Sequence, residues 1–187
     1  MNEAHLEFCA SPEWRQMVEE LVIPAALSDQ DLGDDVLEIG PGPGFTTDVL
    51  RLRTARLTAV EIDADLAYAL GTRLDGTNVD VICADASALD LPDDRFTGAT
   101  SFNMLHHVPT AELQDQIFGE LRRVLRPGGL LVAADSAPRD KLDAFHEGDT
   151  YNPIAPEMLD ERLRATGFTQ FERRDYDLGW VCTARAG

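Results

Sequence analysis

The chain has 187 residues, of which 44% are hydrophobic, and its formal net charge is −18 at pH 7. This length and hydrophobic content predict one globular domain, residues 1–187, and exclude a disordered chain. The acidic excess argues against nucleic acid as a partner, because nucleic-acid binding draws on clustered Lys and Arg. No run of about 18 apolar residues exists, so no membrane span is expected.

The cysteines predict a reducing compartment. Cys9, Cys83 and Cys182 are odd in number and far apart, which is typical of free thiols. The first residues lack the basic start and apolar run of an export signal, so we expect a cytoplasmic protein. No Cys and His residues have zinc spacing, and no metal is expected. The oligomeric state is not indicated.

Residues 1–32 are expected to form an N-terminal helical cap. Ser11 and Pro12 are typical of a helix start, because serine is a good N-cap and proline is tolerated in the first turn. Apolar residues then follow at helical spacing as far as Val22. Pro24 is expected to end or bend this helix.

A strand, a glycine-rich turn and a helix start follow one another in VLEIGPGPGFTT, residues 36–47. Gly40, Gly42 and Gly44 alternate with prolines, so the turn is sharp and presents no side chains to a ligand. A dinucleotide fingerprint starting at Gly40 would need a small residue at position 45, which is Phe45. The turn therefore predicts a nucleotide-like ligand other than a dinucleotide.

An acid precedes this turn. Glu38 lies at the end of the first strand, where a carboxylate opposes a pyrophosphate but suits an ammonium group. Pro43 also lacks the N–H that a phosphate cradle would use. Both residues favour a cationic nucleoside.

The next strand, at 56–63, also ends in an acid. Glu61 lies 17 residues beyond Gly44, near the offset of about 20 at which doubly wound folds place a carboxylate on ribose hydroxyls. Asp63 is better explained as the N-cap of a helix over 64–74.

A third strand, at 79–84, leads to Asp85, which can accept a hydrogen bond from an exocyclic amine such as that of adenine.

The segment at 136–154 is irregular and is expected to form a substrate-side loop. The other predicted elements are a strand at 96–102, a helix capped by Thr110, a buried strand at 130–134, a helix from Pro156, and a closing hairpin at 168–174 and 178–183.

Several motifs in this order carry a family resemblance over residues 33–135: VLEIGPGPG, AVEID, CADASALDLP, SFNMLHHV and LRPGGLLV. The chain resembles the class I S-adenosylmethionine-dependent methyltransferases, particularly small bacterial members that act on small molecules or lipids. The resemblance implies an α/β, three-layer, doubly wound Rossmann-like fold. Its seven-stranded sheet would be mostly parallel with one antiparallel strand.

The resemblance also implies a reaction and a set of contacts. S-adenosyl-L-methionine would donate a methyl group to a small-molecule or lipid acceptor by direct in-line displacement, leaving S-adenosyl-L-homocysteine. The implied contacts are Glu38, Gly40, Gly42 and Gly44 with the methionine end, Glu61 with the ribose hydroxyls, Ile62 with the adenine face, Asp85 and Ala86 with the adenine edge, and Asn103 beneath the methionine moiety.

Histidines are the candidate catalytic residues, since an oxygen or nitrogen nucleophile can need a base near neutral pH. His106 and His107 follow the fourth strand at the ligand-binding edge of such folds. His146 lies in the expected substrate-side loop. A cation-dependent alternative stays open, and its ligands would be Asp135, His146, Glu147 and Asp149.

Other functions also stay open. RNA adenine N6-dimethyltransferases have similar glycine and VEID motifs, but after the fourth strand they carry Asn-Leu/Ile-Pro-Tyr/Phe to hold a flipped base. Here the stretch is Asn103-Met104-Leu105-His106. A non-catalytic protein that binds the cofactor, and an aminopropyl transferase that uses the decarboxylated cofactor, are the further alternatives.

Overall fold

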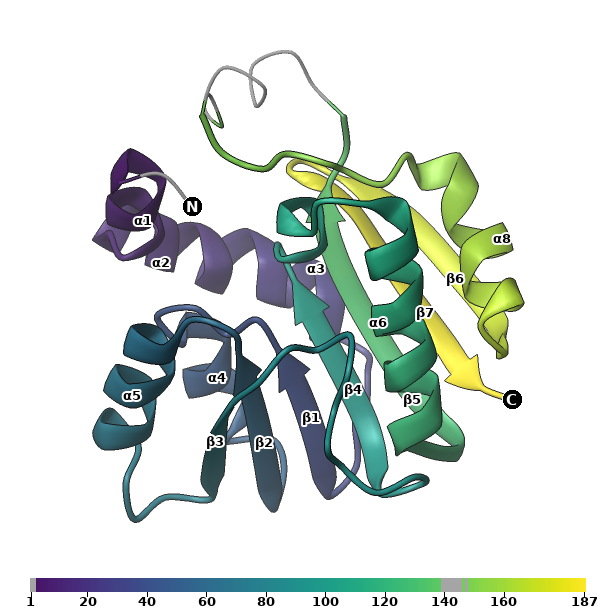
Figure 1. The fold of residues 1–187 in the computed structure, drawn as a ribbon, viewed down its shortest axis with the longest axis horizontal. Coiled ribbons are helices and arrows are strands. Elements are labelled where there is room, and N and C mark those ends of the chain that lie inside the picture. The colour runs from purple at the N-terminus through teal and green to yellow at the C-terminus, as the bar shows by residue number, and fades with distance from the viewer. Residues whose placement is uncertain (1–2, 139–145, 147) are drawn as a thin grey trace.

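The computed structural model describes residues 3–138, 146 and 148–187. Seven strands form one sheet in the order β3-β2-β1-β4-β5-β7-β6 (Figure 1). β7 is antiparallel to both of its neighbours, and the other pairs are parallel. This is the predicted seven-stranded sheet with one antiparallel strand. The strands are β1 (Asp35–Ile39), β2 (Arg56–Glu61), β3 (Val79–Cys83), β4 (Phe96–Phe102), β5 (Leu125–Ser136), β6 (Phe168–Tyr176) and β7 (Gly179–Ala186).

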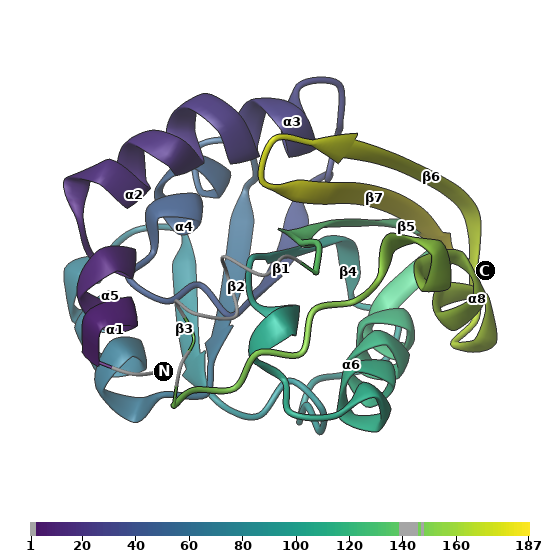
Figure 2. The same ribbon diagram turned by 90° about the horizontal axis from the view of Figure 1, so that it is seen from above.

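Helices cover both faces of the sheet, which gives the three predicted layers (Figure 2). One helical layer packs on β4, β5 and β7 and consists of α6 (Ala111–Val124) and α8 (Pro156–Ala165). The opposite layer contains α2 (Pro12–Met17), the π-helical turn η1 (Val18–Val22), α3 (Ile23–Leu27), α4 (Phe45–Leu50) and α5 (Ala64–Arg73). A further short helix, α1 (Glu3–Cys9), precedes α2.

Side-chain alternation along the central strands explains the two cores. In β5, Leu131 and Ala133 belong to the core under α6 and α8, whereas Leu130 and Val132 belong to the core under α3 and α4. Successive side chains of a strand point to opposite faces, and a parallel sheet with helices on both sides buries both sets. The central strand β1 is accordingly buried at all five positions.

The N-terminal helical run starts as predicted, because the Ser11 hydroxyl accepts a hydrogen bond from the Trp14 N–H at 3.1 Å. Pro24 does not end it. The chain passes through the wider turn η1 and continues as α3, with Pro24 among its first residues. A proline has no N–H to donate, so a local change of helical pitch accommodates it without breaking the helix.

Other predicted helix starts are confirmed by their caps. The Asp63 carboxylate accepts hydrogen bonds from the N–H groups of Asp65 and Leu66 at 2.9 and 3.0 Å. The Thr110 hydroxyl accepts one from Leu113 at 3.2 Å at the start of α6. The strand predicted at 130–134 is longer, because β5 already begins at Leu125 where it pairs with Phe96.

The strand order places a switch point between β1 and β4. From β1 the sheet grows through β2 to β3 in one direction, and from β4 through β5 in the other. In open α/β sheets such a point leaves a crevice at the carboxyl ends of the strands, where ligands bind. Among the helices that the structure describes, none has the length and apolar character needed to cross a bilayer.

Candidate active site

A cavity of about 510 Å³ lies at this switch point. Its floor consists of the residues that follow β1, β2, β3 and β4, and the N-terminal helices form part of its wall. The wall residues from these helices are Leu6, Cys9, Trp14 and Val18. Residues of α6 and of η2 (Leu105–His107), including His107 and Leu113, complete it.

The turn after β1 depends on glycine. Gly40, Gly42 and Gly44 have φ angles of 66°, 53° and 87°, in the left-handed region that other residues adopt at a cost. A Cβ on Gly40 would also overlap Met104, and one on Gly44 would overlap Leu70. Gly40 and Gly42 line the cavity, whereas Gly44 lies behind it as the N-cap of α4.

Glu61, at the end of β2, is fixed in the cavity wall. It is only 6% exposed, and its two carboxylate oxygens accept hydrogen bonds from the N–H groups of Gly42 at 2.9 Å and Asp63 at 3.0 Å. A carboxylate has about four acceptor positions. Glu61 can therefore hold the glycine turn in place and still accept hydrogen bonds from a vicinal diol.

The predicted adenine-binding residues lie together in the same cavity. Ile62 is 68% exposed and lines the cavity, so its apolar side chain is available to cover the face of a bound ring. Asp85 and Ala86 line the wall after β3. One oxygen of Asp85 accepts hydrogen bonds from the N–H and hydroxyl of Ser87, both at 2.8 Å. These bonds orient the carboxylate at the cavity edge.

Asn103 follows β4 with a φ of 51°, a conformation that is uncommon for residues other than glycine and that clusters at functional sites. Its N–H donates to the carbonyl of Ala134 at 2.8 Å, which holds the residue at the end of the sheet. Asn103 lines the cavity beside Met104, and its contact with the methionine end stays a prediction.

Glu38 lies deeper than the sequence suggested. It is 2% exposed and does not belong to the cavity lining. Its carboxylate accepts hydrogen bonds from the hydroxyls of Thr46 and Thr47, the latter at 2.7 Å. Burial raises its pKa to about 7, although both hydrogen bonds oppose the rise. In this structure Glu38 supports the glycine turn from beneath, and a direct contact with an ammonium group stays a prediction.

The raised pKa of Glu38 predicts a pH-dependent stability. Between the ordinary value of 4.5 and about 7, Glu38 keeps a proton in the folded chain that it has lost in the unfolded chain, so its contribution to the free energy of unfolding falls as pH rises and then levels off. A shift of this size is worth about 3 kcal/mol. Other groups, including the buried histidines, change stability over the same range, so the Glu38 contribution is read as a difference: from pH 5 to pH 8, the free energy of urea unfolding of the wild type should fall relative to that of Glu38→Gln. Parallel pH profiles for the two chains would contradict it.

Of the three predicted catalytic histidines, only His107 lines the cavity. His106 is buried behind His107. The Asp135 carboxylate accepts a hydrogen bond from the backbone N–H of His106 at 3.2 Å and also contacts Nδ1 of the His106 ring. His146 is also buried. Residues 139–145 and 147 of the expected substrate-side loop, including Glu147 of the cation-dependent alternative, lie outside the described residues.

Burial keeps His107 and His5 uncharged at neutral pH. Burial, and after it the interactions with the neighbouring imidazoles, lower the pKa of His107 to about 3 and that of His5 to about 4. His107 thus presents an uncharged imidazole at neutral pH. The sequence did not indicate His5 as a site residue, because it lies within the expected N-terminal helical cap, far in the chain from the other histidines. No local pattern shows that α1 packs His5 against His107, with ring centroids 4.7 Å apart.

Comparisons with known proteins agree with this fold. The family model described as "Methyltransferase domain" matches residues 37–133. A probable ribosomal RNA small subunit methyltransferase A of Haloarcula marismortui is 32% identical over 159 residues, which cover 77% of this chain and 54% of the relative. The chain spans between about a quarter and about half of the length of such curated relatives.

Solved structures share the whole architecture. The methyltransferase in complex with the Trm112 methyltransferase activator of Haloferax volcanii superposes with a TM-score of 0.77 at 15% identity, covering 98% of this chain and 93% of that one. The DhpI-SAM-HEP complex superposes with a TM-score of 0.73 at 20% identity, covering 97% and 91%. With the family model matching more than half of its residues, the chain belongs to the methyltransferase domain family.

Proposed function

We propose that this chain is an S-adenosylmethionine-dependent methyltransferase that acts on a small-molecule or lipid acceptor. The observation that carries the proposal is the position of Glu61. This buried carboxylate bridges the glycine turn and the end of β2, and it borders the same cavity as Ile62 and Asp85. Together these residues can accept ribose hydroxyls, cover an adenine face and accept from an adenine amine.

S-adenosylmethionine supplies a methyl group that is already activated on a sulfonium, so the protein mainly has to position the two reactants. Asn103 and the glycine turn border the part of the cavity that the methionine end would occupy. On the acceptor side, the described wall is apolar and comes largely from the N-terminal helices, with Leu6, Trp14 and Val18. An apolar wall of this kind favours a small organic or lipid acceptor.

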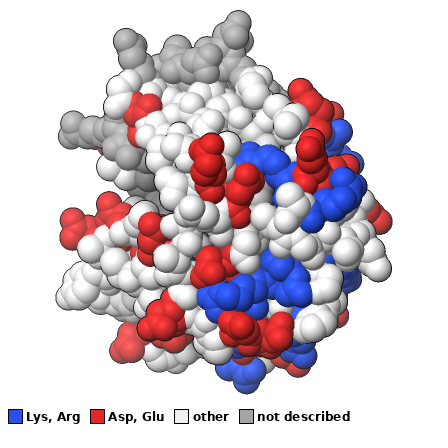
Figure 3. All heavy atoms as spheres, turned by 45° about the vertical axis from the view of Figure 1, so that its right-hand side comes forward, with Lys and Arg blue, Asp and Glu red and all other residues white. Residues whose placement is uncertain are grey.

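The charge distribution supports an acceptor other than nucleic acid. On the face shown in Figure 3, Lys and Arg side chains alternate with Asp and Glu and form no continuous basic surface. Several arginines of the chain are paired: Arg162 contacts Asp115 at 2.6 Å, and Arg123 contacts Asp93 at 2.6 Å and Glu120 at 2.7 Å. Paired cations are poorly placed to neutralise phosphates.

An RNA adenine dimethyltransferase is the second candidate, and the likeness to the Haloarcula marismortui protein is the observation in its favour. The residues after β4 oppose it. Met104, Leu105 and His106 stand where those enzymes carry an aliphatic residue, proline and an aromatic residue for a flipped adenine. Methyl transfer from labelled cofactor to small-subunit ribosomal RNA would favour this candidate, and transfer to a cell extract freed of RNA would favour ours.

Calorimetry tests the proposal directly. S-adenosylmethionine and S-adenosylhomocysteine should each bind with one site per chain, and NAD should not, because the turn lacks the spacing for a pyrophosphate. Mass spectrometry of extracts incubated with the chain and the cofactor should then reveal products heavier by one methylene. Binding of NAD, or no binding of either sulfur compound, would overturn the proposal. Binding without any methylated product would favour the non-catalytic alternative.

A further inference from the structure

All four histidines of the chain gather in one cluster, although they come from three distant segments. His5 belongs to α1, His106 and His107 to η2, and His146 to the segment that leads to α8. The ring centroids lie 4.6 Å apart for His5 and His146, 4.1 Å apart for His106 and His107, and 5.4 Å apart for His107 and His146. Packing alone does not require imidazoles at this place.

We propose that His5, His107 and His146 bind a divalent transition-metal ion such as Zn²⁺. One ring nitrogen from each of the three residues lies within 4.8 Å of those of the other two. Imidazole nitrogens are typical ligands of Zn²⁺ and of its neighbours in the first transition series. The set differs from the carboxylate-rich alternative considered from the sequence, since all three ligands are nitrogens and one of them comes from α1.

The environment of the triad supports a bound ion. His5 and His146 are buried, with 5% and 4% of their surface exposed, so an ion bound to them would be shielded from solvent. Within the described part of the chain, the buried Nδ1 of His107 has no hydrogen-bond partner. A metal ion would use the lone pair of a neutral imidazole nitrogen.

A carboxylate lies beside one ligand and an aromatic ring stacks on another, as outer-shell groups do at metal sites. Asp149 lies 3.5 Å from Nδ1 of His5. The ring of His146 stacks on Tyr151 with centroids 4.3 Å apart, and the Tyr151 hydroxyl donates to the carbonyl of Ala137 at 3.3 Å.

Hydrogen bonds also fix η2, which carries His107, to the segment that follows His146. The Asn152 N–H donates to the carbonyl of His106 at 2.7 Å, and the Gln114 amide donates to the carbonyls of Leu105 and Asn152 at 2.9 and 2.8 Å. The frame that holds two of the three ligands is therefore preformed. Binding of the ion would add α1 to this frame through His5.

The site would serve the proposed methyltransferase at the acceptor side. A tetrahedral ion with three protein ligands keeps one position for water or for an acceptor atom. Since His107 borders the cavity, an ion bound to it would lie at the cavity wall. This role for the ion depends on the proposed function, whereas the metal site itself does not.

The test uses the full chain, freed of metal with a chelator and titrated with zinc chloride in the absence of S-adenosylmethionine. Calorimetry near neutral pH should show one tightly bound ion per chain. Co²⁺ in place of Zn²⁺ should give the intense visible absorption of a four-coordinate site. His5→Gln and His146→Gln should each weaken zinc binding by more than about 100-fold, beyond the loss of about 10–100-fold that is typical for outer-shell partners.

Matched variants separate the histidine ligands from the outer-shell carboxylate and from the thiols. Asp149→Asn should weaken zinc binding by about 10-fold, as an outer-shell partner does. Cys83→Ser removes the exposed thiol, and Cys9→Ser removes a thiol whose pKa burial raises to about 11. Both serine variants should bind zinc like the wild type. Circular dichroism of each metal-free variant establishes that it is folded before it is titrated.

The proposal is overturned if the wild type binds no zinc, if folded His5→Gln and His146→Gln bind it as tightly as the wild type, or if a serine variant abolishes binding. Failure of the metal site and failure of the proposed function can be told apart. The zinc titration contains no S-adenosylmethionine, and the titration with S-adenosylmethionine is run on chelator-treated protein.

Discussion

Replacing Glu61 with Ala should weaken the binding of S-adenosylmethionine by about 1–3 kcal/mol, or roughly 5–150-fold in the dissociation constant, as expected for the loss of charge-assisted hydrogen bonds. The effect has two physical sources. The ribose hydroxyls lose their acceptor, and the N–H groups of Gly42 and Asp63 lose the carboxylate that holds the turn. Calorimetry of the wild type and the variant measures the difference.

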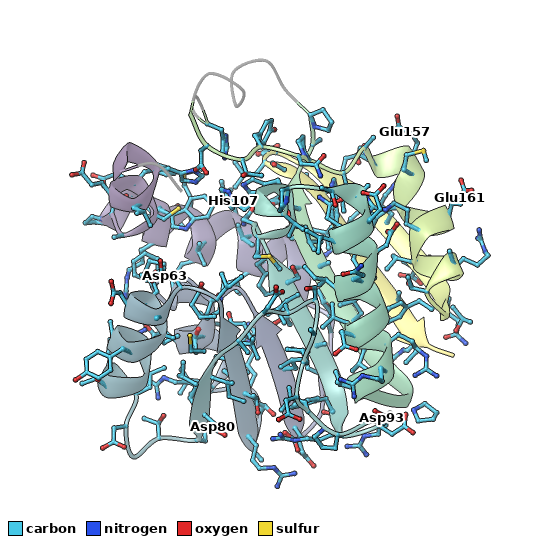
Figure 4. The ribbon with its side chains drawn as sticks, viewed as in Figure 1. Asp63, Asp80, Asp93, His107, Glu157 and Glu161 are labelled. Carbon is cyan, nitrogen blue, oxygen red and sulfur yellow. The ribbon has the colours of Figure 1, made fainter. Side chains whose placement is uncertain are left out.

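A matched carboxylate provides the control. Figure 4 shows Asp80 and Asp93 at one end of the sheet and Asp63 and His107 toward the other, where the cavity lies. Asp80 is exposed on β3, so Asp80→Ala removes the same charge without touching the cavity. It should leave the affinity unchanged. Equal affinities for the wild type and Glu61→Ala would remove Glu61 from the binding site.

Replacing Trp180 with Ala should lower the free energy of unfolding by about 3–5 kcal/mol, the usual cost of truncating a buried aromatic residue. Trp180 is fully buried in β7, in the core beneath α6 and α8. Its indole N–H donates to the carbonyl of Ile154 at 3.2 Å, and the variant leaves that buried acceptor without its donor. Urea unfolding measures the change.

Tyr68 on α5 is the matched control, because it is aromatic and 78% exposed. Tyr68→Ala should change the free energy of unfolding by no more than about 0.5 kcal/mol, as is usual at the surface. Trp180→Phe should fall between the two, since it retains a ring in the core but loses the hydrogen bond. A loss in Trp180→Ala no larger than that in Tyr68→Ala would contradict the position of β7 in the core.

Much of the fold could be predicted from the sequence because local rules and tertiary packing agree. Apolar runs predict the central strands, and Ser11, Asp63 and Thr110 cap helices where their side chains suggest. Where the two disagree, packing prevails. Pro24 predicts the end or a bend of a helix from local chemistry, but η1 allows the chain to continue and to bury Ile23 and its neighbours against the sheet.

The site divides in a similar way. Glu61, Asp85 and Asn103 lie at or just beyond the carboxyl ends of parallel strands. Such ends meet at one edge of the sheet, so the strand assignments alone predict that these residues lie close together. The depth of Glu38 is harder to predict, because it depends on how the hydroxyls of Thr46 and Thr47 turn back under the strand.

The histidine cluster could not be predicted from any local pattern. His5 and His146 are 141 positions apart in the sequence, and only the packing of α1 over the end of the sheet places them side by side. A ligand set assembled from such distant segments has no sequence spacing that would reveal it.

A crystal structure of the chain with S-adenosylmethionine is the most direct test of where the ligand binds. We expect the ribose on Glu61, the adenine between Ile62 and Asp85, and the methionine end between the glycine turn and Asn103. Electron density for the ligand at another place on the chain, or a cavity that stays empty at saturating ligand, would contradict this placement.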